Sequence, residues 1–203
     1  MSAERPGNGR PRAFDEETVL DRAAEVFWRY GYEGASLSDL TDAMGINRPS
    51  LYATFGSKEQ LFRRAFARYR ETTVAYARDT LEQPTAYTVI ESYLRCSVDA
   101  LTTGDHPPGC LSIQGGLACS PANAGISEIL AEGRAASEDA LEERLARAAK
   151  EGDLPDSVDT KALARFVMAL SEGYAVHAAA GASREDLQAS VDIALRAVTA
   201  LYP

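Results

Sequence analysis

The chain has 203 residues, of which 45% are hydrophobic and 25% charged, a composition typical of one ordinary domain or of a small module fused to a larger one. Three cysteines exclude a disulfide-built secreted scaffold, and no apolar run approaches the roughly 18 residues that a membrane-spanning helix needs. The net charge of −9 is unevenly distributed, because residues 1–70 carry 11 basic and 10 acidic side chains whereas residues 71–203 carry 10 and 20. We therefore expect a cytoplasmic protein whose N-terminal third meets a polyanion and whose remainder repels it.

The N-terminal third begins with a stretch that cannot build a core. Residues 1–13 have hardly any apolar side chains and are rich in proline, glycine and arginine, which is typical of a flexible basic arm. From about residue 15 to residue 30, apolar residues recur on one face of a helix, and Gly31 is expected to end it.

Two short helices are predicted next. Ser36 and Asp39 have the spacing of a capping box, so a helix of about two turns should follow Ser36 and end at Gly45 in a left-handed conformation. Asn47 is a good N-cap for another short helix, which should end near Gly56. Two short helices joined by a tight turn and braced by a preceding helix form a helix-turn-helix unit.

The rest of the chain is also expected to be helical. A capping box at Ser57 opens a long helix that Pro84 ends at the latest, and another helix is predicted over 85–103. Residues 104–124 are the least regular part and should hold a short helix at most. Three helices follow: one carrying Ile126 to Leu145, one from Asp159 to about Ala180, and one capped by Ser183 and reaching Leu201.

Strand-like alternation is absent, so the predicted fold class is all-α. We expect a helix-turn-helix DNA-binding domain at residues 14–60 and a helical domain at residues 61–203. The residues at the start of the helix after the turn are of the types that reach base edges and phosphates. From spacing alone, a plain helical hairpin with solvated charges explains the pattern equally well.

The run from Phe27 to Phe62 closely resembles the DNA-binding domain of TetR/AcrR-type transcriptional regulators. Its frame, GY…S…L…A…G…LY…F…SKE.L, matches most of residues 12–65 without gaps, whereas the resemblance fades after about residue 80. By position, the resemblance implies a DNA-facing set of Ser36, Asn47, Arg48, Pro49, Ser50, Tyr52, Thr54 and Lys58. The family often has histidine where this chain has Thr54.

The resemblance implies a reading helix in the major groove, dimerisation through the C-terminal helices, and release from the operator by a ligand. The leading hypothesis is therefore a homodimeric repressor of a pseudo-palindromic operator in double-stranded DNA, with no cofactor, metal or membrane partner. The small residues of the last two helices favour close packing between two subunits, although packing within one chain is the alternative.

The effector is expected to be a moderately apolar small molecule. Its candidate contacts are Tyr93, Cys96, Leu111, Gln114, Phe166, Met168, Tyr174 and His177. For any one of them, a place in the ordinary core is the more common explanation. Cys110 and Cys119 are candidates for a redox or electrophile switch, although free cysteines usually behave as buried hydrophobes. A cysteine-sensing regulator is thus one alternative function. An enzyme using Cys110 as nucleophile with His106 or His177 as base lacks any supporting motif, and an adaptor that has lost DNA binding is a further alternative.

Overall fold

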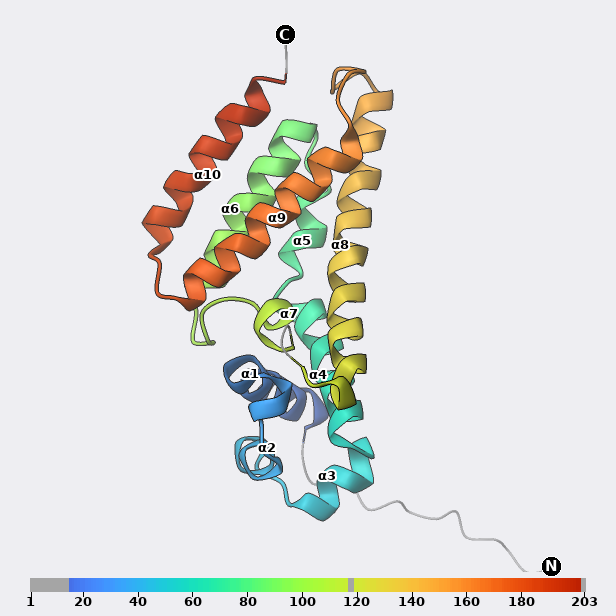
Figure 1. The fold of residues 1–203 in the computed structure, drawn as a ribbon, viewed down its shortest axis with the longest axis vertical. Coiled ribbons are helices and arrows are strands. Elements are labelled where there is room, and N and C mark those ends of the chain that lie inside the picture. Colours follow the sequence, from blue (N-terminus) through green and yellow to red (C-terminus); the bar gives the residue numbers. More distant parts are fainter. Residues whose placement is uncertain (1–14, 117–118, 202–203) are drawn as a thin grey trace, which may run out of the picture.

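The computed structural model describes residues 15–116 and 119–201, and every regular element in that part of the chain is a helix (Figure 1). The predicted basic arm at residues 1–13 lies outside the described residues. The helices are α1 (Glu16–Gly34), α2 (Leu37–Met44), α3 (Arg48–Phe55), α4 (Lys58–Thr72), α5 (Tyr76–Thr80), α6 (Ala86–Thr102), α7 (Leu111–Gln114), the 3-10 turn η1 (Pro121–Asn123), α8 (Ala124–Lys150), α9 (Thr160–Ala179) and α10 (Arg184–Thr199). None of these helices is long and apolar enough to cross a bilayer.

Local capping signals set the bounds of α2 and α3, as predicted. Ser36 and Asp39 form a reciprocal capping box at the start of α2, and Gly45 ends that helix with a φ of 67°. The Asn47 side chain accepts a hydrogen bond from the backbone N–H of Ser50 at the start of α3. Each of these interactions joins residues three positions apart or fewer, which is why they can be predicted from the sequence.

The regular part of α1 stops at Gly31, as predicted. Gly31 leaves the helical region, with a φ of 68° and a ψ of 171°, and after this kink a further helical turn extends α1 to Gly34. Just after the kink, the backbone N–H of Tyr32 donates to the carbonyl of Gly115 at 2.8 Å. The glycine therefore directs the last turn of α1 against α7.

The long helix expected after Ser57 is also divided. It ends at Thr72, and α5 is a separate short helix, because the N–H groups of Thr73 and Val74 both bond to the carbonyl of Tyr69 and interrupt the helical register. No proline or glycine marks this break. At the other end of the chain, Leu201 lies beyond the end of α10 and is partly exposed.

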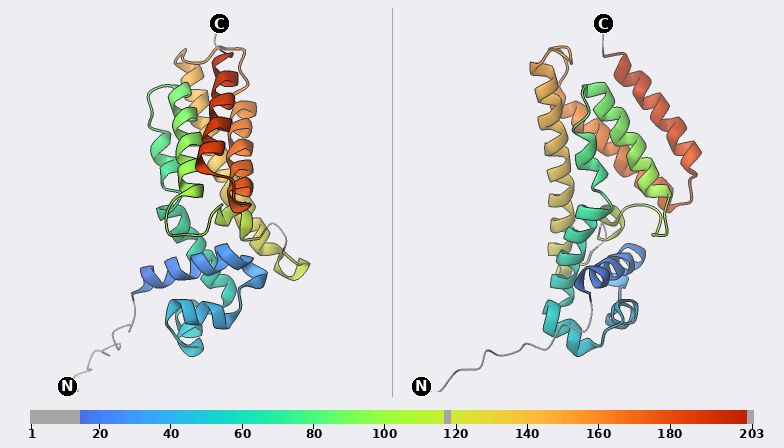
Figure 2. Two further views of the ribbon diagram at one scale, coloured as in Figure 1. Left: turned by 90° about the vertical axis from the view of Figure 1, so that its left-hand side faces the viewer. Right: turned by 180° about the vertical axis from the view of Figure 1, so that it is seen from behind.

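Two hydrophobic cores are joined by α7 and α8, each of which contributes side chains to both. The lower core contains residues of α1–α4 together with Leu111 of α7 and the first turns of α8, and the upper core is formed mainly by α6, α8, α9 and α10. Figure 2 shows α4 passing from the α1–α3 unit up to the bundle, alongside α8. Gly133 of α8 permits this close approach, because a β-carbon there would lie 3.0 Å from the Phe66 ring of α4.

Candidate functional site

The N-terminal turn of α3 stands at the lower end of the molecule, away from the upper bundle (Figure 1). Leu51 and Phe55 anchor the helix in the lower core, whereas Arg48, Pro49 and Tyr52 are exposed. A short helix fixed by two buried side chains and exposed along its opposite face has the form of a reading helix, which inserts its N-terminal residues into the major groove.

The predicted DNA-facing residues differ in how they are held. Ser36 and Asn47 use their side chains as helix N-caps, so each already has a backbone partner. The Arg48 guanidinium donates a hydrogen bond from Nη2 to the hydroxyl of Ser38 at 2.9 Å, which directs it across the turn between α2 and α3. Tyr52 is 47% exposed. Two others, Ser50 and Thr54, are half-buried.

Lys58 is turned toward α1. Its Nζ lies 4.5 Å from the centre of the Tyr32 ring, a cation–π contact. Burial lowers the pKa of Lys58, and the nearby carboxylate of Glu33 opposes that shift. Lys58 is also the first residue of α4, so its backbone N–H belongs to a helix N-terminus that favours an anion.

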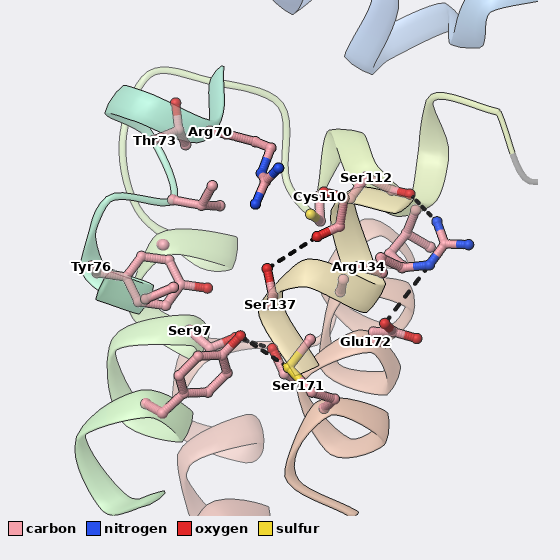
Figure 3. Close-up of a pocket in the computed structure, with 18 of the residues that line it drawn as sticks. Arg70, Thr73, Tyr76, Ser97, Cys110, Ser112, Arg134, Ser137, Ser171 and Glu172 are labelled. Carbon is pink, nitrogen blue, oxygen red and sulfur yellow. Dashed lines mark hydrogen bonds and ion pairs between the residues drawn. The ribbon is translucent and has the colours of Figure 1, made fainter. Parts of the chain in front are cut away.

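The upper bundle encloses a cavity of about 220 Å³ (Figure 3). It lies between the end of α4, α5, α6, α7, α8 and α9, and much of its wall is apolar or aromatic. Burial raises the pKa of the Tyr69, Tyr76 and Tyr93 phenols, so all three are neutral hydrogen-bond donors at physiological pH. The phenol of Tyr93 donates to Met168 Sδ at 3.2 Å.

Polar groups in the cavity wall are mostly paired with one another. Arg134 donates from Nη1 to the carbonyl of Ser112 at 2.7 Å, and its Nε lies 3.8 Å from Glu172 Oε1. Burial raises the pKa of Glu172, and Arg134 counters that shift. The Tyr69 hydroxyl donates to Cys110 Sγ at 3.2 Å.

Few of the predicted effector contacts lie in this cavity. Tyr93 and Met168 line it, as does Cys110, and Gln114 lines a separate shallow hollow beside Cys119. The other predicted contacts lie outside its wall: Cys96 is half-buried, Leu111 belongs to the lower core, Tyr174 packs in the upper core, and Phe166 and His177 are exposed. Periodicity identified apolar helix faces but did not identify which face turns to the cavity.

A contact of α1 with α4 and α7 was missed by the sequence analysis. Trp28 of α1 is 2% exposed, and its indole N–H donates to Gln114 Oε1 of α7 at 3.0 Å. The indole also stacks on His106, with ring centres 4.7 Å apart, and meets Tyr69 edge-on at 5.1 Å. Because Tyr69 and Gln114 belong to elements of the cavity wall, Trp28 links the cavity to α1. The only available signal was that Trp28 is the single tryptophan of the chain.

A second link joins the end of α1 to the start of α8. The Glu33 carboxylate accepts hydrogen bonds from the backbone N–H and hydroxyl of Ser120 and from the amide of Asn123, at 2.7–2.9 Å. These bonds, with that of Asn123 foremost, hold the pKa of Glu33 at about 2. No group of three or more metal-ligating side chains is present in the described residues.

Comparisons with known proteins agree with this arrangement. A family model described as "Bacterial regulatory proteins, tetR family" matches residues 19–65. The HTH-type transcriptional repressor ComR of Escherichia coli K12 is 34% identical over 93% of this chain and 90% of that protein. An uncharacterized HTH-type transcriptional regulator of Bacillus subtilis, YezE, is 34% identical over 92% of this chain and 97% of that protein.

The solved structures include a similar protein bound to DNA. A cysteine mutant of the TetR family transcriptional regulator CifR, complexed with 26-base-pair operator DNA, has a TM-score of 0.90 and 42% identity, covering 96% of this chain and 100% of that one.

Proposed function

The chain belongs to the tetR family of bacterial regulatory proteins, which are DNA-binding transcriptional regulators, and from this premise we propose that it is a homodimeric repressor released from its operator by a small molecule. The observation that carries the proposal is the exposed N-terminal half of α3, anchored by Leu51 and Phe55. The similarity of the chain to CifR, which was solved with operator DNA, also supports the assignment of α3 as the helix that contacts DNA. Binding to DNA implies action in the cytoplasm.

We assign the DNA contacts to residues 14–60 and to the start of α4. Arg48 would exchange its hydrogen bond with Ser38 for a base edge, and Tyr52 and Lys58 would contact phosphates. Ser36, Asn47, Pro49, Ser50 and Thr54 complete the proposed set. Residues 61–203 would carry dimerisation and effector binding, and their excess of acidic side chains would keep them away from the DNA.

An exposed apolar seam supports dimerisation through α9 and α10. On α9, the exposed residues Ala162, Phe166, Ala169 and Val176 follow spacings of four, three and seven, which is the pattern of a helix that packs against another helix. Ile193 of α10 is 66% exposed. Two copies of these helices would form a four-helix interface and hold the two α3 helices about 34–36 Å apart, in successive major grooves.

Release would follow if the effector binds more tightly to a form of the dimer in which the two α3 helices no longer match this spacing. The cavity next to α4 is the proposed effector site. The contacts of Trp28 with Gln114, His106 and Tyr69 offer a physical connection from the cavity wall to α1.

The first test is selection of bound sequences from a random DNA library by the full-length protein at physiological salt. Enrichment of a pseudo-palindrome supports a dimeric, sequence-reading regulator, and no enrichment counts against it. Light scattering provides a second measurement, in which the wild type should have a dimeric mass and Ile193→Asp a monomeric one. A monomeric wild type at micromolar concentration would contradict the proposed dimer.

A cysteine switch is a second candidate function, favoured by the position of Cys110 in the cavity wall beside the Tyr69 hydroxyl. Its test is thiol alkylation of the native protein, and an inert Cys110 and Cys119 would remove it. We propose that the chain has no catalytic activity. His106 is stacked on Trp28 and its Nδ1 lies 3.1 Å from the Pro107 carbonyl oxygen, whereas the hydrogen-bond partner of Cys110 is the Tyr69 hydroxyl.

A further inference from the structure

Arg70 is the half-buried arginine of the cavity wall that makes no hydrogen bond or ion pair with the described residues. It lies in the last turn of α4 and is half-buried. Among the described residues it makes no hydrogen bond and no ion pair, in contrast to Arg63 of the same helix, which pairs with Glu59 at 2.8 Å. Figure 3 shows the Arg70 guanidinium directed into the space between Tyr76 and Ser137.

The cavity wall has more positive than negative side chains, whereas the surrounding domain is acidic. Residues 71–203 carry 20 acidic and 10 basic side chains, yet the charged residues lining the cavity are Arg70, Arg78, Arg134 and Glu172. Arg134 and Glu172 face each other, so the positive charge of Arg134 is balanced by a negative charge within the wall. Arg78 is exposed to solvent. An excess of positive charge thus remains at Arg70, in an otherwise acidic domain.

The cavity wall also has neutral hydroxyls, of which that of Tyr93 already donates to Met168 Sδ and that of Ser137 to the Gly133 carbonyl. The phenols of Tyr76 and Tyr93 remain protonated because burial raises their pKa, and the cavity also has hydroxyls at Thr73 and Ser137. The same wall has apolar side chains, among them Leu101 and Met168. A guanidinium, neutral donors and an apolar wall together suit a molecule with one anionic end and an apolar body.

We propose that the effector of this cavity is a small organic carboxylate whose anionic group pairs with Arg70. A planar guanidinium binds a carboxylate through two parallel hydrogen bonds, and pairing relieves the cost of holding the Arg70 charge partly out of water. A cavity of about 220 Å³ is smaller than the roughly 300–1,000 Å³ of pockets for drug-sized ligands, so the apolar body must be small. The assignment rests on the proposed function only in naming this ligand the effector.

Arg70 is well placed to transmit binding because it belongs to α4. The opposite end of that helix follows α3 directly, with only Gly56 and Ser57 between them. The preceding residue, Tyr69, contacts both Cys110 and Trp28. A carboxylate that pairs with Arg70 would therefore act directly on the helix that positions the DNA-binding unit, without an intervening loop.

The test is binding of matched probes to the full-length protein. Hexanoate, octanoate, cyclohexanecarboxylate and phenylacetate are each compared with the corresponding amide, which keeps the shape and removes the charge. Binding is followed by the fluorescence of Trp28, the single tryptophan of the chain. We expect at least one carboxylate to bind about tenfold or more tightly than its amide, as a charge-assisted hydrogen bond allows.

Substitutions then identify the residue responsible. Arg70→Gln should weaken carboxylate binding about tenfold and leave amide binding unchanged, removing the preference, and Arg70→Lys should restore part of it. Arg63→Gln, an exposed arginine on the same helix, is the matched control and should bind both probes as the wild type does. The proposal is overturned if no carboxylate is preferred over its amide, or if Arg70→Gln keeps the preference.

A separate assay distinguishes this site from the proposed function. The carboxylate that binds best is added to complexes of protein with the selected operator, and release is followed by fluorescence anisotropy of labelled DNA. Release from the wild type and from Arg63→Gln supports the carboxylate as effector. Arg70-dependent binding without release refutes the effector role and leaves the anion site standing, whereas failure to bind any DNA refutes the proposed repressor and does not affect the fluorescence result.

Discussion

Gln114→Ala should destabilise the protein by removing the acceptor of the Trp28 indole N–H. The donor lies on a side chain that is 2% exposed and makes its hydrogen bond at 3.0 Å, so no water can easily replace the lost carbonyl. A buried donor left without a partner costs about 1–3 kcal/mol. Trp28→Phe removes the donor and keeps most of the aromatic surface. Its cost includes altered packing against His106 and Tyr69 as well as the lost hydrogen bond.

A double-mutant cycle separates these contributions. Once Trp28 is phenylalanine, Gln114→Ala should cost less by about 0.5–1.5 kcal/mol, which is the net value of one such hydrogen bond. The assay is urea unfolding followed by far-ultraviolet circular dichroism, at a fixed protomer concentration because dimers gain stability with concentration. Gln60→Ala, an exposed glutamine of α4, is the control and should stay within about 0.5 kcal/mol of the wild type.

The cycle can refute the assigned contact. If Gln114→Ala costs the same in the Trp28→Phe protein as in the wild type, the two side chains are not coupled. The connection from the cavity wall to α1 would then have to run through the ring contacts of Trp28 with Tyr69 and His106.

Three further predictions concern the DNA-binding unit and its attachment. Arg48→Ala should cost about 1–3 kcal/mol of operator affinity and relax sequence preference, whereas Lys58→Ala should weaken binding to all sequences alike and lower the salt slope by about one, as titrations at several salt concentrations would measure. Equal losses on operator and random DNA for both variants would contradict these roles. Glu33→Gln should lower the melting temperature at neutral pH. Since the folded-state pKa of Glu33 is lowered from 4.5 to about 2, its stabilising effect is present above 4.5 and is lost as the pH falls toward 2, so the difference between variant and wild type should narrow over that window. A difference that stays constant there would disprove the contribution of the charged carboxylate. Gly45→Ala should cost about 1 kcal/mol in urea unfolding, because the φ of 67° strains a residue with a β-carbon although no atom obstructs it, and an unchanged stability would show that the turn can relax.

The sequence was most informative where structure depends on near neighbours in the chain. The cap at Ser36, the left-handed Gly45 and the cap at Asn47 involve residues within one turn of each other, and α2 and α3 have the predicted bounds. The end of α4 depends on packing between distant segments. Nothing in the local sequence indicates that the chain turns after Thr72, which is why one long helix was expected.

The residues that line the cavity were harder to predict, because they depend on how each helix is rotated about its own axis. Phe166 and Met168 are two residues apart on α9, yet one is 40% exposed and the other lines the cavity. Both are apolar, so composition does not separate them. Arg70 was counted with the charge-balanced N-terminal third, and only the path of α4 toward the upper bundle brings its side chain to the cavity wall.

The continuity of α4 has a mechanical consequence. At 1.5 Å per residue, its 15 residues form a rod of roughly 22 Å. A tilt of ~10° about the cavity end would carry the other end sideways by ~4 Å, and a symmetric partner would move by the same amount. Recognition of two half-sites tolerates little change in a separation of about 34–36 Å, so small motions at a cavity of about 220 Å³ are enough to change the fit to DNA. The helix thus converts a small rotation at the cavity into a larger displacement of the DNA-binding unit, and the size of that displacement depends on how little its fifteen residues bend.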